Sequence, residues 1–271
     1  MLTKELERFI EEDMGSLPYE IVRDINARAA IVAKEDGVLS GMAEALQVFR
    51  YFSVEARALR EDGQEIHSGD IVLDAEGSAG GILMAERLAL NFLGRMSGIA
   101  TLTAQCMKKA GKVIIAGTRK TTPGFRKFEK KAIIAGGGDP HRYSLTDAVM
   151  VKDNHIALRG LENAVKNAKK AGFTRKVEVE VESAEDALLA SELGADIVMF
   201  DNMTPAEIAR CISAVRKRYP HVIIEASGGI TPENLSEYAA AGVDVISMGA
   251  LTRDARWLDF SLEVTVLTGR G

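Results

Sequence analysis

The segment IVMFDNMTP, residues 197–205, contains a complete transition from a strand to a helix and decides how the second half of the chain is interpreted. Its first four residues are apolar, which is typical of a parallel strand that is buried on both faces. Asp201 follows directly. Thr204 and Pro205 form a strong helix start, because threonine caps the first turn and proline fits the first helical position. The segment therefore predicts one β–α unit with a carboxylate at the end of its strand.

The same β–α pattern repeats on both sides of this segment. We expect strands at residues 113–116, 148–151, 177–181, 197–200, 222–225 and 245–248. We expect helices at residues 160–172, 184–193, 205–219 and 232–241, several of which end at a glycine. Six strands in this rhythm predict an α/β barrel that is incomplete.

The first hundred residues have shorter and more varied elements. Helices are expected at residues 3–13 and 41–51, and β segments at residues 29–33, 38–39, 53–59, 71–73 and 79–83. A long helix is expected over 84–110, although Gly94 and Gly98 should each weaken it by roughly 1 kcal/mol relative to alanine. Close packing or a break in the helix would explain these glycines. The pattern predicts a separate α+β domain with a largely antiparallel sheet.

Composition excludes several classes of partner. The 271 residues carry a formal net charge of −5, so no overall field favours nucleic acid or an anionic membrane. Cys106 and Cys211 lack metal-ligand spacing, and we interpret them as reduced core residues of a cytoplasmic protein. The N-terminus lacks the apolar region of a signal peptide, and no apolar run is long enough to span a bilayer.

Candidate functional residues lie near or directly after the ends of the predicted strands. In chain order they are Lys120, Lys152, Glu180, Asp201, the segment Ser227-Gly228-Gly229, and Gly249. The carboxyl ends of barrel strands meet at one face, which is where such barrels have their active sites. One charged residue after a strand would mean little, whereas the same feature after six strands predicts a site.

The charges near these strand ends indicate an anionic small molecule. Arg119, Arg142 and Lys152 lie among glycines and buried strands, and several cations in one pocket suit a ligand with more than one anionic group. His141 could act as a general base, but a lone histidine is more often structural. The alternative for the arginines and lysines is the usual solvated surface.

Carboxylates and glycines also lie at the carboxyl ends of the predicted strands. Glu180 and Asp201 suit sugar hydroxyls or Mg²⁺. Glu178 and Glu182 share a strand face with Glu180, so the sequence leaves open which of the three contacts a ligand. The glycines after the last two strands favour a phosphate cradle over two tight turns that merely need glycine.

Together these motifs identify the chain as similar to the quinolinate phosphoribosyltransferase family. The motifs are LNFL (90–93), SGIAT (97–101), TRKTTPG (118–124), GGG (136–138) with His141-Arg142, KDNH (152–155), EVEV (178–181), DNM (201–203), EASGGI (225–230) and GAL (249–251). The resemblance runs from about residue 20 to the end of the chain. It implies transfer of the phosphoribosyl group of phosphoribosyl pyrophosphate to quinolinate, giving nicotinate mononucleotide, pyrophosphate and CO₂ in NAD biosynthesis. Mg²⁺ is the implied cofactor, with no organic cofactor.

The resemblance also implies an architecture. It consists of an N-terminal α/β sandwich domain (1–104), joined by the C-terminal segment 252–271, and the incomplete (open) α/β barrel of type II phosphoribosyltransferases (105–251). The implied assembly is a homodimer, or a hexamer built as a trimer of dimers, in which a neighbouring subunit contributes to each active site.

Residue roles follow from the resemblance by position. The implied quinolinate clamp is Arg119, His141, Arg142 and Lys152, with Arg87 supplied across the dimer interface. The implied phosphoribosyl pyrophosphate site is Lys120, Glu180, Asp201, Ser227, Gly228, Gly229 and Gly249. Lys120, Lys152, Glu180 and Asp201 are the implied catalytic residues, and Glu180 with Asp201 the implied Mg²⁺ ligands.

Three other functions compete with this one. A molybdate-transport-associated paralogue has the same fold, but the intact KDNH motif at 152–155 argues against it. A nicotinate-specific phosphoribosyltransferase would need fewer carboxylate-binding cations than this chain has. A phosphate-sugar sensor without catalytic activity would need a DNA-binding appendage, and the sequence has no recognisable one.

Overall fold

The computed structural model describes residues 4–15, 22 and 25–267, and these separate into two units. Unit 1 consists of Met1–Leu102, Ile134–Gly136 and Ala255–Gly271. Unit 2 consists of Thr103–Ile133 and Gly137–Asp254. We describe each unit by itself.

Unit 1 is built on an antiparallel sheet with the strand order β12-β1-β5-β3. Its strands are β12 (Phe260–Val266), β1 (Asn26–Ala33), β5 (Ile71–Ser78) and β3 (Glu55–Ala58), and the short strands β2 (Gly37–Val38) and β4 (Glu65–Ile66) form a separate pair. Burial alternates along the first part of β1, which gives this sheet one packed face. The C-terminal strand thus pairs with the first strand of the chain.

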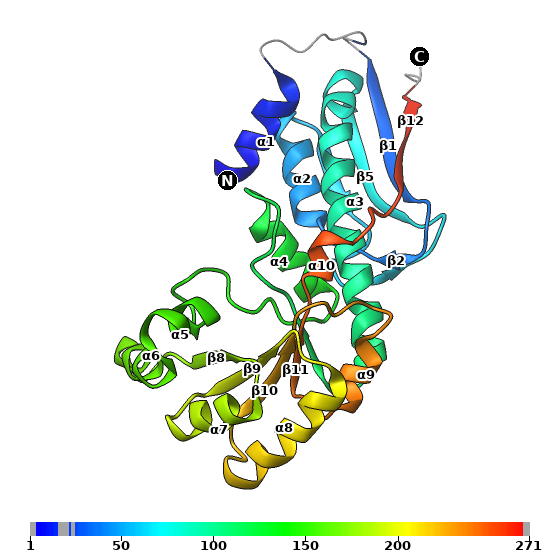
Figure 1. Cartoon of the computed structure of the whole chain (residues 1–271). Helices are drawn as coiled ribbons and strands as arrows, with labels where there is room; N and C mark the ends of the chain where they lie inside the picture. The colour runs from blue at the N-terminus through cyan, green and yellow to red at the C-terminus, as the bar shows by residue number, and fades with distance from the viewer. Residues whose placement is uncertain (1–3, 16–21, 23–24, 268–271) are drawn as a thin grey trace. The chain divides into compact units, whose positions relative to one another are not determined.

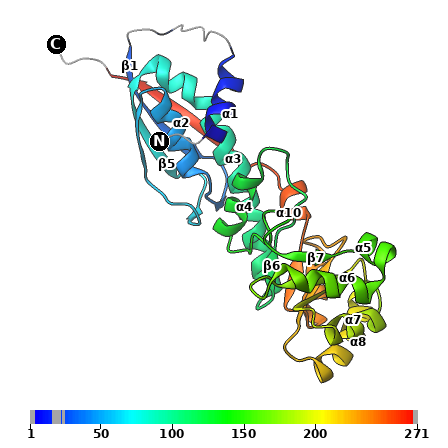
Figure 2. The same cartoon turned by 90° about the vertical axis from the view of Figure 1, so that its left-hand side faces the viewer.

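Three helices complete unit 1 (Figures 1 and 2). They are α1 (Lys4–Met14), α2 (Met42–Tyr51) and α3 (Ala79–Ala110), whose last residues belong to unit 2. Side chains such as Phe49 and Phe92 are completely buried in its core. The predicted helices at 3–13 and 41–51 are confirmed to within a residue, apart from Thr3, which lies outside the described residues.

The β segment predicted at residues 79–83 is wrong, because these residues form the first turns of α3. The prediction failed because Gly80 and Gly81 have a low helix propensity and therefore argued against a helix here. A Cβ at position 81 would lie 2.8 Å from the carbonyl oxygen of Phe52, so the close approach of a neighbouring segment requires glycine.

The predicted long helix is unbroken, and close packing explains its glycines. The carbonyl oxygen of Gly94 accepts a hydrogen bond of 3.0 Å from the backbone of Leu258. A Cβ on Gly98 would overlap the carbonyl oxygen of Arg256. The two glycines therefore let the segment that precedes β12 lie directly on the helix.

We expect Gly98→Ala to destabilise the protein, although helix propensity alone would make this change stabilising by roughly 1 kcal/mol. The added methyl group has no space beside the Arg256 backbone, and overpacking of this kind costs about 1–3 kcal/mol. Urea denaturation followed by circular dichroism measures the change. Gln105→Ala, at an exposed position of the same helix, is the control. A higher midpoint for Gly98→Ala would contradict the close approach.

Unit 2 contains one parallel sheet of six strands with the order β6-β11-β10-β9-β8-β7. The strands are β6 (Ile114–Ala116), β7 (Val149–Val151), β8 (Val177–Val181), β9 (Ile197–Asp201), β10 (Ile223–Ser227) and β11 (Val245–Ser247). All six agree with the prediction to within two residues. The first strand pairs with the last, but β6 and β7 do not pair with each other. The sheet is therefore an incomplete barrel, as predicted, and the structure shows that it is open between its first two strands.

The helices of unit 2 differ more from the prediction. Those that agree are α7 (Ala184–Glu192) and α8 (Pro205–Arg218), and α8 begins with the predicted Thr204 cap. The sequence did not predict α4 (Arg126–Ala135), α5 (Asp153–Arg159) or α10 (Ala250–Arg253). The helix expected over 160–172 is α6 (Leu161–Ala168) followed by a 3₁₀ turn, η1 (Lys169–Ala171).

The helix predicted at 232–241 is shorter than expected. It is α9 (Leu235–Ala240), because the side chain of Asn234 accepts a hydrogen bond from the backbone of Thr231 and holds a turn there. The Thr231-Pro232 pair therefore does not begin a helix, and the helix N-terminus is farther from the glycines at 228 and 229 than the sequence suggested. Within the described ranges, no helix is both long enough and apolar enough to cross a membrane.

Candidate active site

A cavity of about 480 Å³ lies at the carboxyl ends of the unit 2 strands. Ten of the residues predicted from the sequence line it: Arg119, Lys120, His141, Arg142, Lys152, Glu180, Asp201, Ser227, Gly228 and Gly229. They come from the last residues of β8, β9 and β10, from the loops that follow β6, β7 and β10, and from the segment that precedes β7. The volume is in the range of small-molecule sites. The open barrel therefore gathers these cations, carboxylates and glycines into one place.

Lys152 and Glu180 form the shortest ion pair in the cavity. Lys152 Nζ lies 2.7 Å and 2.8 Å from the two carboxylate oxygens of Glu180. The contact follows from the sheet, since Val151 is in register with Val179 and the next residues of β7 and β8 meet at the same edge. The pair keeps a cation and a carboxylate together at the mouth of the barrel.

The structure distinguishes the three glutamates that the sequence could not separate. Glu178 is completely buried inside the sheet, and Glu182 is exposed beyond the end of β8. Glu180 lies between these positions and lines the cavity. The carboxylate that can contact a ligand in this cavity is therefore Glu180.

Tight backbone contacts shape the glycine-rich side of the cavity. Asn202 has a positive φ of 55°, and its backbone N–H donates to the carbonyl oxygen of Ser227 at 3.0 Å. Gly228 has φ 90°, and a Cβ there would lie 2.6 Å from the backbone nitrogen of Asn202. Both its conformation and its surroundings require glycine. The loops after β9 and β10 thus bring backbone groups close to the ligand space.

The two arginines of the cavity have different surroundings. Nε of Arg119 is buried and has no hydrogen-bond partner among the described residues, so an anionic ligand could accept a bond from it. The Arg142 guanidinium donates to the sulfur of Met150 at 3.0 Å. Burial lowers the pKa of Arg142, while the charge of Glu178 opposes that shift. Arg142 nevertheless stays cationic, because an arginine is not deprotonated in proteins.

His141, which lines the cavity, forms a cluster with the buried Glu178 and Glu225, and the possible ligand atoms of the three all lie within 4.8 Å of one another. Nε2 of His141 lies 3.3 Å from each oxygen of Glu225 and 3.8 Å from Glu178. Burial and the charge of Glu225 raise the pKa of Glu178 to about 7. Burial alone would lower the pKa of His141, but the hydrogen bond and charge of Glu225 raise it.

A buried lysine adjoins this cluster. Lys130 is only 3% exposed, and its ammonium group donates to the carbonyl oxygen of Pro140. Burial, together with the charge of Arg126, lowers its pKa to about 8. Sequence reasoning gave Lys130 and Glu225 no role. A charge within a run of strand residues, as at Glu225, was the signal that could have found one of them.

Two predicted site residues do not line the cavity. Gly249 is close to it, since a Cβ there would lie 3.4 Å from Cδ of Lys120. Arg87 belongs to α3 in unit 1, where its side chain is exposed. The structure of a single chain therefore does not place Arg87 at the cavity.

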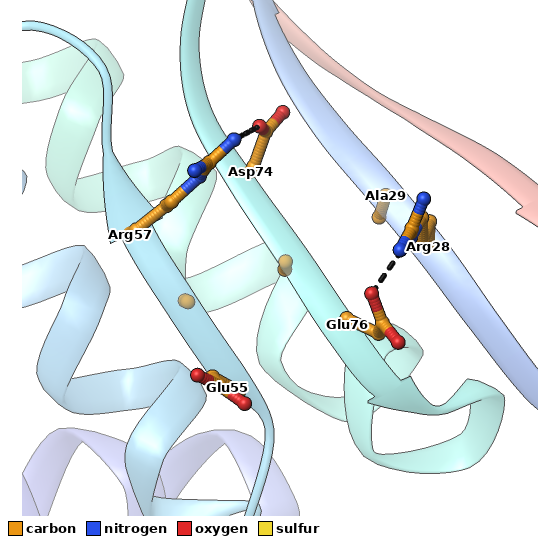
Figure 3. A pocket seen from close by; sticks show the side chains of 8 residues that line it. Arg28, Ala29, Glu55, Arg57, Asp74 and Glu76 are labelled. Atoms are coloured by element: carbon orange, nitrogen blue, oxygen red, sulfur yellow. Dashed lines mark hydrogen bonds and ion pairs between the residues drawn. The ribbon is translucent and has the colours of Figure 1, made fainter.

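A second hollow, of about 460 Å³, lies on the exposed face of the unit 1 sheet (Figure 3). Arg28 contacts Glu76 at 2.7 Å, and Arg57 contacts Asp74 at 2.9 Å. These are cross-strand pairs on an exposed surface, where such pairs contribute little to stability. The charges of both arginines are already matched, so this hollow is a weaker candidate for binding an anion.

Fold and cavity together define an α/β-barrel protein whose cavity is lined by cations suited to a small molecule with several anionic groups. Family models extend this description: residues 13–97 match the N-terminal domain, and residues 99–263 the C-terminal domain, of quinolinate phosphoribosyl transferase. The chain belongs to the quinolinate phosphoribosyl transferase family.

Individual relatives agree with the family models. The chain is 49% identical to a probable carboxylating nicotinate-nucleotide pyrophosphorylase of Archaeoglobus fulgidus, over 92% of this chain and 99% of that protein. It is 43% identical to the human carboxylating nicotinate-nucleotide pyrophosphorylase, over 96% and 90% of the two chains. The crystal structure of NadC from Streptococcus pyogenes matches with a TM-score of 0.92 and 38% identity, covering 99% of both chains.

Proposed function

We propose that the protein transfers the phosphoribosyl group of phosphoribosyl pyrophosphate to quinolinate and releases CO₂, giving nicotinate mononucleotide and pyrophosphate. The observation that carries the proposal is the cavity itself, where Arg119, Arg142 and Lys152 adjoin Glu180 and Asp201. Three cations suit a dicarboxylate, and two carboxylates suit a ribose that becomes positively charged. The names of the relatives describe the same reaction read in the opposite direction.

Each group has a part in the proposed reaction. Arg119, Arg142 and Lys152 hold the two quinolinate carboxylates and aim the pyridine nitrogen at ribose C1. As the N–C1 bond forms, the bond from C1 to pyrophosphate breaks, and Lys120 faces the leaving anion. Glu180 and Asp201 stabilise the oxocarbenium-like ribose. The bond from the ring to the 2-carboxylate then breaks, CO₂ leaves, and the ring carbon takes a proton from water.

The glycine-rich loops suit the phosphate of the same substrate. Ser227, Gly228 and Gly229 offer a hydroxyl and closely approaching backbone at the end of β10, and Gly249 leaves room beside Lys120. Anion binding by backbone N–H groups needs such a close approach. We assign the 5′-phosphate to these loops.

Mg²⁺ fits the carboxylates of the cavity. Asp201 and Glu180 supply oxygen ligands, and this cation is commonly held by one or two carboxylates together with substrate phosphates. When bound, it would neutralise charge on the pyrophosphate. Because Glu180 is already paired with Lys152, we assign Asp201 the larger share of this binding.

Product analysis tests the proposed function. Purified protein is incubated with phosphoribosyl pyrophosphate, Mg²⁺ and either quinolinate or nicotinate, and the products are separated by chromatography. We expect nicotinate mononucleotide and CO₂ from quinolinate alone. Product from nicotinate alone would show a nicotinate phosphoribosyltransferase instead, and product from neither would favour the molybdate-linked paralogue or a sensor.

We expect Arg142→Ala to raise the KM for quinolinate by about a hundredfold, the usual loss when a charged hydrogen bond to a carboxylate is removed. The KM for phosphoribosyl pyrophosphate should change far less. Arg218→Ala, at an exposed position of α8, is the matched control. Steady-state kinetics with each substrate varied in turn measures both constants, and equal losses for the two substrates would refute the clamp assignment.

We propose that the protein works as a homodimer, or as a hexamer of three dimers, with Arg87 of one subunit completing the cavity of another. The exposed position of Arg87 on α3 is compatible with this role. Cys106 and Cys211 are unpaired and buried, as is usual in a reducing compartment, which supports a cytoplasmic location.

A further inference from the structure

His141 is one of the few described residues other than glycine with a positive φ. Its φ of 54° lies in the left-handed region, which residues with a Cβ rarely adopt. Such a conformation is strained and persists only where the surroundings hold it. Arg142, the next residue, carries one of the cations of the cavity. The groups that hold His141 in this conformation therefore also set the backbone position of Arg142.

Several contacts hold this turn. The backbone N–H of His141 donates to Asp139 Oδ1 at 2.6 Å, and the carbonyl oxygen of Pro140 accepts from the buried Lys130. The backbone N–H of Arg142 donates to Nδ1 of the His141 ring at 2.8 Å. The imidazole ring thus connects the backbone of this turn, through Nδ1, to the group that contacts Nε2.

That other nitrogen contacts Glu225. Glu225 is 1% exposed and lies on β10, in the middle of the sheet, so its position is set by the core rather than by a loop. Nε2 lies 3.3 Å from both of its oxygens. Because Nδ1 accepts a hydrogen bond, it carries no proton, and in a neutral ring the proton must be on Nε2. His141 therefore donates to Glu225.

The same contacts argue against a metal ion in this cluster. A histidine that binds a metal through Nε2 normally donates a hydrogen bond through Nδ1. Here a backbone N–H occupies the Nδ1 side, so the ring has no proton to donate there. The geometry suits a hydrogen bond from the ring to a carboxylate, rather than a metal ligand.

We propose that Glu225 is a positioning residue for quinolinate: it fixes the His141 ring through Nε2, and the ring fixes the backbone of Arg142 through Nδ1. The inference rests on the proposed function, because it assigns Arg142 to the quinolinate carboxylates. Glu225 does not line the cavity, so it acts through His141 and not by contact with the substrate. Strand β10, which carries Glu225, thereby sets the position of Arg142, which lies on a segment outside the helices and strands.

Kinetics of Glu225 variants test this role. In Glu225→Leu the ring loses its acceptor, and we expect the KM for quinolinate to rise about tenfold, as for the loss of one buried hydrogen bond. The KM for phosphoribosyl pyrophosphate and kcat should stay within about twofold. Glu225→Gln keeps an acceptor oxygen and should restore most of the affinity, since its amide can donate to Glu178. Glu162→Leu, on the exposed face of α6, is the control.

A double-mutant cycle separates action through His141 from a direct effect of charge. His141→Asn tolerates the positive φ but has a shorter side chain without the imidazole ring. If Glu225 acts through the ring, adding Glu225→Leu to His141→Asn leaves the KM for quinolinate unchanged. Additive losses in the double variant would overturn the proposal.

A spectroscopic measurement on the unaltered protein does not depend on the stability of any variant. The chain has only four histidines, so selective ¹⁵N labelling gives few signals, and His141→Asn assigns one of them. At about pH 9, where a histidine ring is neutral, we expect a solvent-protected Nε2–H proton and an unprotonated Nδ1 for His141. A ring with its proton on Nδ1 would overturn the proposal, whether or not the protein turns over quinolinate. Absence of turnover with the expected spectrum would instead contradict the proposed function.

Discussion

Replacing Lys152 with methionine is expected to lower kcat/KM for quinolinate by about a thousandfold, because it removes a cation from the cavity and leaves Glu180 without its partner. Both oxygens of Glu180 lie within hydrogen-bonding distance of Lys152 Nζ, and the glutamate side chain is only 13% exposed. The substitution keeps the length of the side chain, so packing changes little. Steady-state kinetics of the purified variant measures the loss.

A double variant shows which of these two effects dominates. Glu180 is itself proposed to stabilise the ribose, so Lys152→Met/Glu180→Gln is compared with Glu180→Gln alone. If the lysine contacts substrate, as we propose, the double variant is far less active than Glu180→Gln. Equal activities of these two variants would show instead that the lysine only neutralises Glu180, and would remove it from the substrate clamp.

Replacing Arg87 with alanine is expected to lower activity by about a hundredfold, although Arg87 does not line the cavity of its own chain. The reason is the proposed sharing of each active site between subunits. Mixing Arg87→Ala with Lys152→Ala under conditions of subunit exchange should restore activity. In a mixed dimer one site lacks both residues and the other has both, so random exchange leaves about a quarter of all sites intact.

The control for this experiment uses two residues of the same cavity. Arg142→Ala mixed with Lys152→Ala cannot produce an intact site, because every chain then lacks a residue of its own cavity. Native mass spectrometry confirms that subunits exchanged. If the Arg87 mixture recovers no more activity than the control after confirmed exchange, the shared site is wrong.

The strands of the barrel could be predicted from the sequence because their signal is local. The run at residues 197–200 is apolar throughout, and it is followed directly by a polar residue and a helix start. Charged residues after these runs could be gathered into one site for the same reason, since parallel strands end at one edge. Lys152, Glu180 and Asp201 do lie together in the cavity.

What the sequence could not predict depends on contacts between distant residues. The glycines at 80 and 81 suggested a β segment, whereas the approach of the Phe52 backbone explains why Gly81 lies in a helix. Burial separated Glu178 from Glu180, because period-two alternation gives both the same face. For Glu225 the sequence offered only a charge within a strand, and for Lys130 nothing; their contacts with His141 and Pro140 are visible only in the structure.

The opening of the sheet between β6 and β7 affects which part of the barrel unfolds locally most easily. The central strands β9 and β10 have a neighbour on both sides, whereas β6 and β7 end the sheet. Local unfolding begins where fewest backbone hydrogen bonds must be broken. Lys120 and Lys152, which follow these two border strands, are therefore carried by the most easily opened part of the barrel, while Asp201 and Ser227 are carried by its most persistent part. The residues proposed to hold the ribose and its phosphate thus lie on the most stable strands, whereas Lys152 of the proposed quinolinate clamp and Lys120 at the pyrophosphate follow the least stable ones.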